Sequence, residues 1–186
     1  MTAVNQQHLQ AIYAQCDDPW GFRSSAYEQA KFRATVNVLS RQIYASALEL
    51  GCGNGELARH VAPRCDAYTG LDAVGSALAS AKRAVPGGRF VQAYLPCVLP
   101  EGQYDLIMLS EVLYFLDQAG LRSLGQQIVR RWPEAEIIAV TWLGPSGNPM
   151  EGEAALTAFS DAVTPTLRPT MLARSLQYRI DRFAAS

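Results

Sequence analysis

Apolar residues occur along this chain in two patterns: short, nearly continuous runs, and longer helix-like stretches that also contain polar residues. The run over residues 104–110 is typical of a strand buried on both faces of a parallel sheet. One of the longer stretches is stopped by Pro133, because proline cannot continue a helix. The two kinds of segment alternate with short connections, which predicts an open α/β sheet with helices on both faces.

The predicted elements cover most of the chain. Strands are predicted at residues 46–50, 66–71, 89–93, 104–110, 136–142, 170–174 and 178–183. Helices are predicted at residues 6–15, 27–39, 56–62, 76–85, 119–132 and 152–163. A chain of 186 residues with one such alternating series suits a single domain.

Charge and composition exclude several classes of function. A net charge of −1 argues against a nucleic-acid-binding surface, which needs a basic footprint. The polar N-terminus lacks the apolar core of a signal peptide, and no apolar run approaches the roughly 18 residues that would suggest a membrane span. The four cysteines are scattered without a CxxC or Cys/His cluster. We therefore expect a cytoplasmic protein with reduced thiols, no metal site and no membrane partner.

A glycine-rich turn follows the first predicted strand, in the sequence Leu48-Glu49-Leu50-Gly51-Cys52-Gly53-Asn54-Gly55. A dinucleotide fingerprint would place glycine at position 56, but Glu56 stands there and would oppose a pyrophosphate. Asp72, at the end of the next strand, is where an acceptor for ribose hydroxyls is expected. The pattern predicts a site for an adenosine-containing ligand without phosphates. The alternative is a tight turn whose glycines serve the backbone alone.

A second group of candidates follows the fourth predicted strand. Ser110, Glu111 and Tyr114 lie there, and ligands of open α/β sheets bind outside the carboxyl ends of the strands. We therefore expect them on the same rim as the glycine turn, Asp72 and Tyr94. Glu111 could orient a cationic or polar acceptor, or take a proton after group transfer. The alternative is a glutamate that caps a helix or is simply solvated.

Three segments, residues 18–35, 47–66 and 104–116, together resemble the nodulation protein S-type class I S-adenosylmethionine-dependent methyltransferases. The motifs DPW…YEQAKF and LSEVLYFL carry this resemblance more specifically than the glycine turn. It implies a single-domain, doubly wound Rossmann-like sheet over residues 1–186, mostly parallel with an antiparallel strand near the C-terminus. It also implies a helical lid over residues 1–40 and a core over residues 41–186.

The resemblance also implies which residues bind the cofactor, S-adenosylmethionine. Gly51 and Gly53 would pass close to its methionine moiety, Asp72 would accept from both ribose hydroxyls, and Trp20 and Arg33 would close over it. Tyr94 stands where the family commonly has an acidic residue for the adenine amino group. The full expected set is Trp20, Arg33, Glu49, Gly51, Cys52, Gly53, Gly55, Asp72, Ala73, Ala93, Tyr94, Leu95 and Ser110.

Aromatic residues are frequent in the N-terminal segment, and their faces can cover a sulfonium or a nucleoside. We assign Trp20 and Arg33 to the ligand, and Tyr13 and Phe32 to packing between helix and sheet. Cys52, inside the glycine turn, is interpreted as a small filler rather than a nucleophile. His8 and His60 are isolated, and we interpret both as surface groups.

These observations lead to a hypothesis of methyl transfer to a small polar acceptor, preferably the nitrogen of an amino sugar or oligosaccharide. Glu111 and Tyr114 are the predicted catalytic residues, and with Trp142 they are expected to contact the acceptor. An O-methyltransferase is the first alternative, although oxygen demands a stronger base or a metal. A non-catalytic cofactor-binding partner protein is the second, motivated by Tyr94 and the short tail after residue 142.

Overall fold

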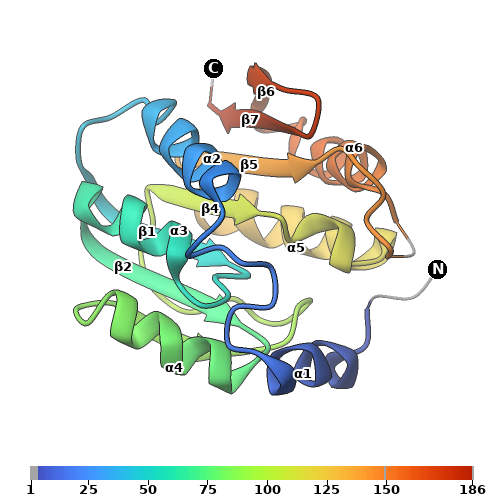
Figure 1. Ribbon diagram of the computed structural model, residues 1–186. Coiled ribbons are helices and arrows are strands. Elements are labelled where there is room, and N and C mark those ends of the chain that lie inside the picture. Colours follow the sequence, from blue (N-terminus) through green and yellow to red (C-terminus); the bar gives the residue numbers. More distant parts are fainter. Residues whose placement is uncertain (1–3, 149, 186) are drawn as a thin grey trace. The chain divides into compact units, whose positions relative to one another are not determined.

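The computed structural model describes residues 4–148 and 150–185 (Figure 1). The chain divides into two compact units, one of residues 5–94 and one in which Val4 joins residues 95–185. Each unit is considered separately below. The expectation of a single domain over residues 1–186 stays a prediction, and residues 1–3, 149 and 186 within it lie outside the described part of the chain.

The first unit is a three-stranded parallel sheet with helices. Its strands are β1 (Tyr44–Leu50), β2 (Cys65–Asp72) and β3 (Arg89–Gln92), in the order β3-β2-β1. Its helices are α1 (Gln6–Gln15), α2 (Ala26–Asn37), α3 (Glu56–Val61), α4 (Gly75–Ala84) and a short 3-10 turn at Ala62–Arg64. Leu50 pairs with Leu71, and Asp72 with Gln92, so the three carboxyl ends meet at one edge.

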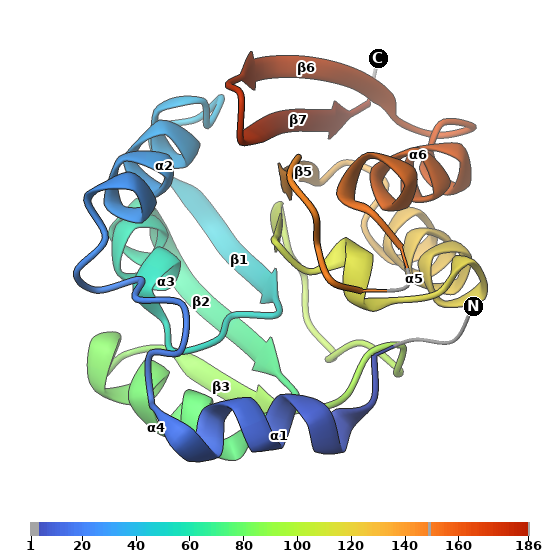
Figure 2. The same cartoon turned by 45° about the vertical axis from the view of Figure 1, so that its right-hand side comes forward.

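Burial and capping explain why these elements form. The β1 side chains of Leu48 and Leu50 are fully buried, which stabilises the strand between its neighbouring layers. Ser25 caps α2 by accepting from the amide of Glu28 at 3.2 Å, and Asn5 caps α1 in the same way. Figure 2 shows α1 beside the carboxyl ends of β2 and β3, the edge at which a ligand of such a sheet binds.

The second unit is a mixed sheet with two long helices. Its strands are β4 (Leu106–Ser110), β5 (Glu136–Trp142), β6 (Arg168–Arg174) and β7 (Tyr178–Ala184), in the order β4-β5-β7-β6. Its helices are α5 (Gln118–Arg131), α6 (Gly152–Val163) and a short 3-10 turn at Leu113–Phe115. β4 and β5 are parallel, whereas β7 is antiparallel to both β5 and β6.

Two contacts within this unit show how closely it packs. Phe159 of α6 meets Phe183 of β7 edge to face, with ring centroids 5.5 Å apart. The helices α5 and α6 lie side by side (Figures 1 and 2), and a Cβ on Gly125 would come within 2.8 Å of the Ala162 side chain. Asp117 caps α5 by accepting from the amide of Gly120 at 2.8 Å.

No described helix is both long and apolar enough to cross a membrane.

The predicted helices and strands all form, in the predicted order, and all of their ends agree within two residues. β1 begins two residues earlier than expected because Tyr44 pairs with Cys65 and its ring is buried. β4 begins two residues later, because Tyr104 packs edge to face on Trp132 of α5 at 5.0 Å instead of continuing the strand. The predicted antiparallel strand near the C-terminus belongs to a hairpin of two, β6 and β7.

Candidate functional site

The glycine turn between β1 and α3 has a left-handed backbone at three positions. Gly51, Gly53 and Gly55 have φ angles of 77°, 52° and 83°, which favour glycine. A Cβ on Gly55 would lie 2.7 Å from the Cα atom of Ala81, so this glycine is needed for packing against α4. A Cβ on Gly53 would instead lie 3.0 Å from the Tyr13 hydroxyl oxygen. The backbone conformation therefore accounts for all three glycines, and Gly53 in addition faces a polar atom.

Asp72 holds the glycine turn through its carboxylate. Its Oδ2 atom accepts from the amide of Gly53 at 2.9 Å, and its Oδ1 atom accepts from the amide of Val74 at 2.9 Å. Burial raises the pKa of Asp72, while these backbone hydrogen bonds act in the opposite direction. Each carboxylate oxygen can accept more than one hydrogen bond, so this geometry is compatible with hydroxyl donors as well.

A row of aromatic rings leads away from Gly53. Tyr13 is buried and meets Trp20 edge to face at 5.3 Å, and Trp20 stacks on Phe22 at 5.7 Å. Trp20 remains 43% exposed, so much of its side chain is accessible. Burial, and then the charge of Asp72, raise the pKa of the Tyr13 hydroxyl well above its usual range, which keeps this group a hydrogen-bond donor.

Glu111 has the most unusual backbone of the second unit's candidates. It has a φ angle of 55°, and a left-handed residue other than glycine costs about 1–3 kcal/mol. Its Oε2 atom accepts from the Tyr114 hydroxyl at 2.7 Å and from the backbone amide of Trp142 at 2.9 Å. The structure thus brings together Glu111, Tyr114 and Trp142, the three residues predicted to contact the methyl acceptor. Helix capping does not describe Glu111, since Asp117 caps α5.

Comparisons with known proteins identify the family. Residues 2–136 match the family described as Nodulation protein S (NodS), which is more than half of the chain. This chain belongs to the nodulation protein S family. The recognition made from the three sequence segments is therefore confirmed.

Two relatives in this family illustrate how far the similarity extends. The nodulation protein S of Sinorhizobium fredii (strain NBRC 101917 / NGR234) is 29% identical over 159 residues, which cover 83% of this chain and 68% of the relative. That of Bradyrhizobium diazoefficiens is 32% identical over 117 residues, which cover 60% of this chain and 55% of the relative. For that second relative, the matched part is only about half of its length.

Solved structures confirm the Rossmann-like methyltransferase fold. The N-methyltransferase NodS from Bradyrhizobium japonicum WM9, in complex with S-adenosyl-L-homocysteine, superposes with a TM-score of 0.81 at 21% identity, covering 97% of each chain. Human N-acetylserotonin methyltransferase in complex with S-adenosylmethionine superposes with a TM-score of 0.70 at 18% identity, over 96% of this chain and 59% of that one. At these identities the likeness establishes the fold.

Glu49, a predicted cofactor residue of this NodS-family chain, is buried at the end of β1. It is 1% exposed and accepts a hydrogen bond from the Tyr68 hydroxyl. Burial raises the pKa of the Glu49 carboxyl to about 7, opposed by the Tyr68 hydrogen bond and assisted by the nearby charge of Asp72. Its contact with the cofactor stays a prediction, and its carboxyl group is already hydrogen-bonded to Tyr68.

Cys52 packs inside the same turn. Its Sγ atom would be 2.9 Å from a Cβ placed on Gly70, and burial raises the pKa of the thiol well above its usual value. A protonated thiol in contact with β2 agrees with the interpretation of a small filler. The alternative of a nucleophile receives no support from this environment.

The other predicted cofactor residues in the first unit lie in two places. The Ala73 carbonyl accepts from Gln92 Nε2 at 3.1 Å, the Ala93 amide donates to the Asp72 carbonyl at 2.9 Å, and Tyr94 packs against the cluster around Tyr13. These residues therefore lie near Asp72. Arg33 is exposed on α2, and its contact with the cofactor stays a prediction. Burial, and then the charges of Arg59 and Arg33, lower the pKa of His60.

Two predicted cofactor residues of the second unit lie at the two ends of the segment that contains β4. Ser110 is the last residue of β4, and Leu95 is buried at the start of the loop before that strand.

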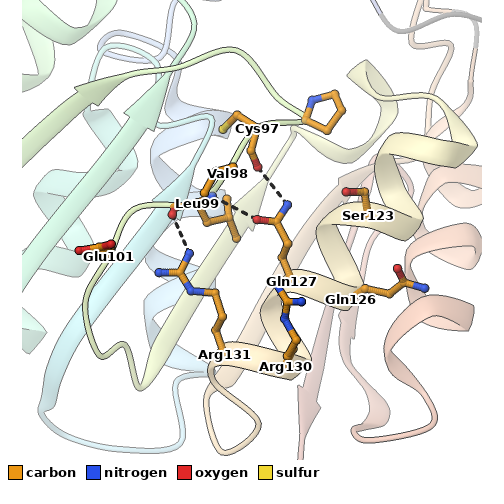
Figure 3. A pocket seen from close by; sticks show the side chains of 10 residues that line it. Cys97, Val98, Leu99, Glu101, Ser123, Gln126, Gln127, Arg130 and Arg131 are labelled. Atoms are coloured by element: carbon orange, nitrogen blue, oxygen red, sulfur yellow. Dashed lines mark hydrogen bonds between the residues drawn. The ribbon is translucent and has the colours of Figure 1, made fainter.

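Figure 3 shows a pocket between this loop and α5. Gln127 and Arg131 point across it and bond to the loop backbone, with Arg131 donating to the Leu99 carbonyl at 2.6 Å. These side chains brace the loop.

Tyr13 was assigned to packing from the sequence, and it does pack in a buried cluster with Ala73, Val74 and Ala77. The sequence did not show that its hydroxyl oxygen also faces Gly53 or that its ring contacts Trp20. Asp18 and Asn54 were also not singled out, although both lie within segments that identified the family. Asp18 accepts from Asn54 Nδ2 at 2.9 Å, across 36 residues of sequence.

Proposed function

We propose that this chain methylates the nitrogen of a small polar acceptor, preferably the free amine of an amino sugar or oligosaccharide. As a member of the nodulation protein S family, it is an S-adenosylmethionine-dependent methyltransferase. The relative solved with the demethylated cofactor product is named an N-methyltransferase, which supports nitrogen as the acceptor atom. The observation that carries the proposal is the glycine turn held by Asp72, beside Tyr13 and Trp20.

The residues around this turn fit S-adenosylmethionine. The Asp72 oxygens, each already bonded to one amide, retain acceptor capacity for the ribose hydroxyls. Trp20 offers an exposed aromatic face next to Tyr13, which suits a cation or a nucleoside. Asp72 is acidic, as suits a ligand that carries a sulfonium and an ammonium group rather than phosphates. When bound, the cofactor would supply a methyl group on a sulfonium, whose sulfur is a good leaving group.

Glu111 is the proposed partner of the acceptor. Tyr114 and the Trp142 amide fix its Oε2 atom, so the carboxylate is held in one orientation without help from a ligand. A carboxylate next to an amine favours the charged form of that amine, whereas only the uncharged form can attack a methyl group. We therefore assign Glu111 to orientation of the acceptor and to receipt of the proton as the product forms. Trp142 offers an aromatic ring for a sugar face.

A methyl-transfer assay with paired acceptors tests this proposal. Cofactor with a radiolabelled methyl group is incubated with a glucosamine oligomer that has one free amine, and with the same oligomer after N-acetylation. We expect label in the first and none in the second, since acetylation removes the attacking lone pair but keeps every hydroxyl group. Label in both oligomers would instead indicate O-methylation.

A binding measurement completes the test. Calorimetric titration with S-adenosyl-L-homocysteine reports on the cofactor site whatever the acceptor is. Binding without transfer to any member of a broad amine and hydroxyl panel would favour the non-catalytic partner protein. Absence of binding would contradict the proposed cofactor site itself.

A further inference from the structure

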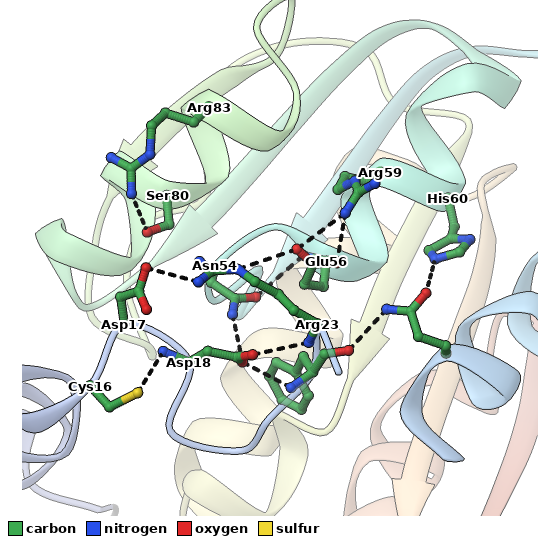
Figure 4. A network of polar contacts seen from close by, with 12 residues as sticks. Cys16, Asp17, Asp18, Arg23, Asn54, Glu56, Arg59, His60, Ser80 and Arg83 are labelled. Atoms are coloured by element: carbon green, nitrogen blue, oxygen red, sulfur yellow. Dashed lines mark hydrogen bonds and ion pairs between the residues drawn. The ribbon is translucent and has the colours of Figure 1, made fainter. Parts of the chain in front are cut away.

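A network of polar contacts joins the segment between α1 and α2 to the glycine turn (Figure 4). We propose that Asp18, acting through Asn54, is a positioning residue that holds this segment, and with it Trp20, against the turn and so sets the affinity for the cofactor. The inference rests on the proposed contact of Trp20 with the cofactor. It does not depend on which acceptor is methylated.

Asp18 organises its own segment first. Its Oδ1 atom accepts from the Phe22 amide at 2.8 Å, and its Oδ2 atom accepts from the Arg23 amide at 3.0 Å. These bonds close the backbone around residues 18–23, which include Trp20. The carboxylate of Asp18 thereby fixes the conformation from which the Trp20 ring projects toward Tyr13 and Phe22.

Asn54 then links this closed segment to the glycine turn. It is 2% exposed, and its Nδ2 atom donates to the Asp18 Oδ1 atom at 2.9 Å. Its Oδ1 atom accepts from the amide of Glu56, the first residue of α3, at 3.4 Å. A buried amide that loses one of its partners retains the cost of its desolvation, so the bond to Asp18 favours the docked segment over the undocked one.

Glu56 adds a second, ionic tie. This carboxylate, which is 4% exposed, lies 3.1 Å from Arg59 on its own helix and 3.6 Å from Nε of Arg23 on the segment. In the sequence, Glu56 is the residue that argues against a pyrophosphate ligand. In the structure the Glu56 carboxylate faces Arg23 and Arg59 (Figure 4). Glu56 therefore also binds the segment through Arg23.

Docking of the segment also determines where the ring of Trp20 lies relative to Tyr13. Trp20 lies between Asp18 and Phe22 in the sequence and contacts Tyr13, whose hydroxyl oxygen faces Gly53. If the bond between Asp18 and Asn54 is lost, Trp20 is no longer held at a fixed place beside the turn. The cofactor must then pay the ordering entropy of the segment when it binds, which weakens its affinity without altering any atom that touches it.

The test compares Asp18→Ala with Asp17→Ala. Asp17 is the neighbouring carboxylate, which is exposed and forms an ion pair with the exposed side chain of Arg23 at 2.9 Å. We expect Asp18→Ala to raise the dissociation constant for S-adenosyl-L-homocysteine about tenfold, the equivalent of one charge-assisted hydrogen bond. Asp17→Ala should bind within about twofold of the unchanged protein. Asp18→Asn keeps one acceptor oxygen and should fall between.

A double-mutant cycle with Asn54→Ala identifies the route of this effect. If Asp18 acts through Asn54, the combined variant should bind little worse than the weaker of the two single variants. Additive losses, or an Asp18→Ala variant that binds as well as Asp17→Ala, would overturn the proposal. Binding is measured by calorimetry, and the melting temperature of each variant is recorded to separate lost docking from lost folding.

Hydrogen exchange of the unchanged protein gives an answer even if Asp18→Ala fails to fold. The Phe22 and Arg23 amides, which both donate to Asp18, should exchange more slowly than in an unstructured peptide, and more slowly still with S-adenosyl-L-homocysteine bound. Peptide-like exchange in both states would refute the docked segment. A chain that protects these amides but never binds the nucleoside would refute the proposed function, and with it the link to affinity, while leaving the docked segment in place.

Discussion

Replacing Glu49 by glutamine should change how the stability of this protein depends on pH. The Glu49 carboxyl is 1% exposed and accepts from the Tyr68 hydroxyl, and its pKa is raised from 4.5 to about 7. The main cause is burial, which penalises the charged form. Glutamine has nearly the same shape, can still accept from Tyr68 through its amide oxygen, and is neutral at every pH.

The sign and size of the effect follow from proton linkage. The folded state binds the Glu49 proton more tightly than the unfolded chain, so the contribution of this group to stability is fully present below pH 4.5. It is lost as the pH rises through about 7. At about 1.36 kcal/mol per pKa unit, the shift from 4.5 to about 7 corresponds to about 3 kcal/mol. The stability of Glu49→Gln relative to the unchanged protein should therefore increase by about 3 kcal/mol over this range.

Urea unfolding of both proteins at several values between pH 4.5 and pH 8, without cofactor, measures this difference. Tyr68→Phe is a useful companion, since it removes the hydrogen bond that holds the Glu49 pKa down and should steepen the pH dependence. If the unfolding free energies of Glu49→Gln and the unchanged protein run parallel across this range, Glu49 does not titrate as a buried carboxyl and the reasoning is wrong.

Three further predictions concern the two candidate sites. Glu111→Gln should lower turnover while the cofactor dissociation constant stays nearly unchanged, and Tyr114→Phe should lower turnover less. Unaltered rates in steady-state kinetics would leave Glu111 with a structural role alone, through its bonds to Tyr114 and Trp142. Asp72→Ala should weaken cofactor binding by about 1–3 kcal/mol in calorimetry, and should also lower the melting temperature because the Gly53 and Val74 amides lose their acceptor. Gly55→Ala should lower the free energy of unfolding in urea far more than Gly147→Ala. Both glycines have positive φ, but only Gly55 has a backbone atom 2.7 Å from the added Cβ. Equal losses of unfolding free energy would mean that backbone strain alone causes the effect.

The local pattern of the sequence predicted the elements well because each one satisfies its own periodicity and its own boundary residues. The strand at residues 136–142 and the helix at residues 152–163 form with the predicted bounds. The 3-10 turn at Leu113–Phe115 was not predicted, since it is too short to show a period. The alternation of these elements predicted the α/β sheet, and the motifs identified the family.

The site was predicted less completely, for physical reasons that differ between residues. Helical spacing shows that the Tyr13 side chain is buried, but it does not show which atom its hydroxyl reaches. The bond from Asn54 to Asp18 depends on how two distant segments dock, and no local pattern encodes that distance. The left-handed backbone of Glu111 occurs where its amide and its carboxylate both bond to β5, and such a backbone is more usual for glycine or asparagine than for glutamate, so nothing in the sequence indicated it.

The bonds that Asp72 makes to the glycine turn limit how its proposed contact with the nucleoside can be redesigned. A substitution made to alter that proposed contact also releases the amides of Gly53 and Val74, so nucleoside selectivity and rigidity of the turn would change together. Libraries aimed at modified nucleosides should therefore begin at Tyr94, which packs against the Tyr13 cluster, and keep Asp72 constant.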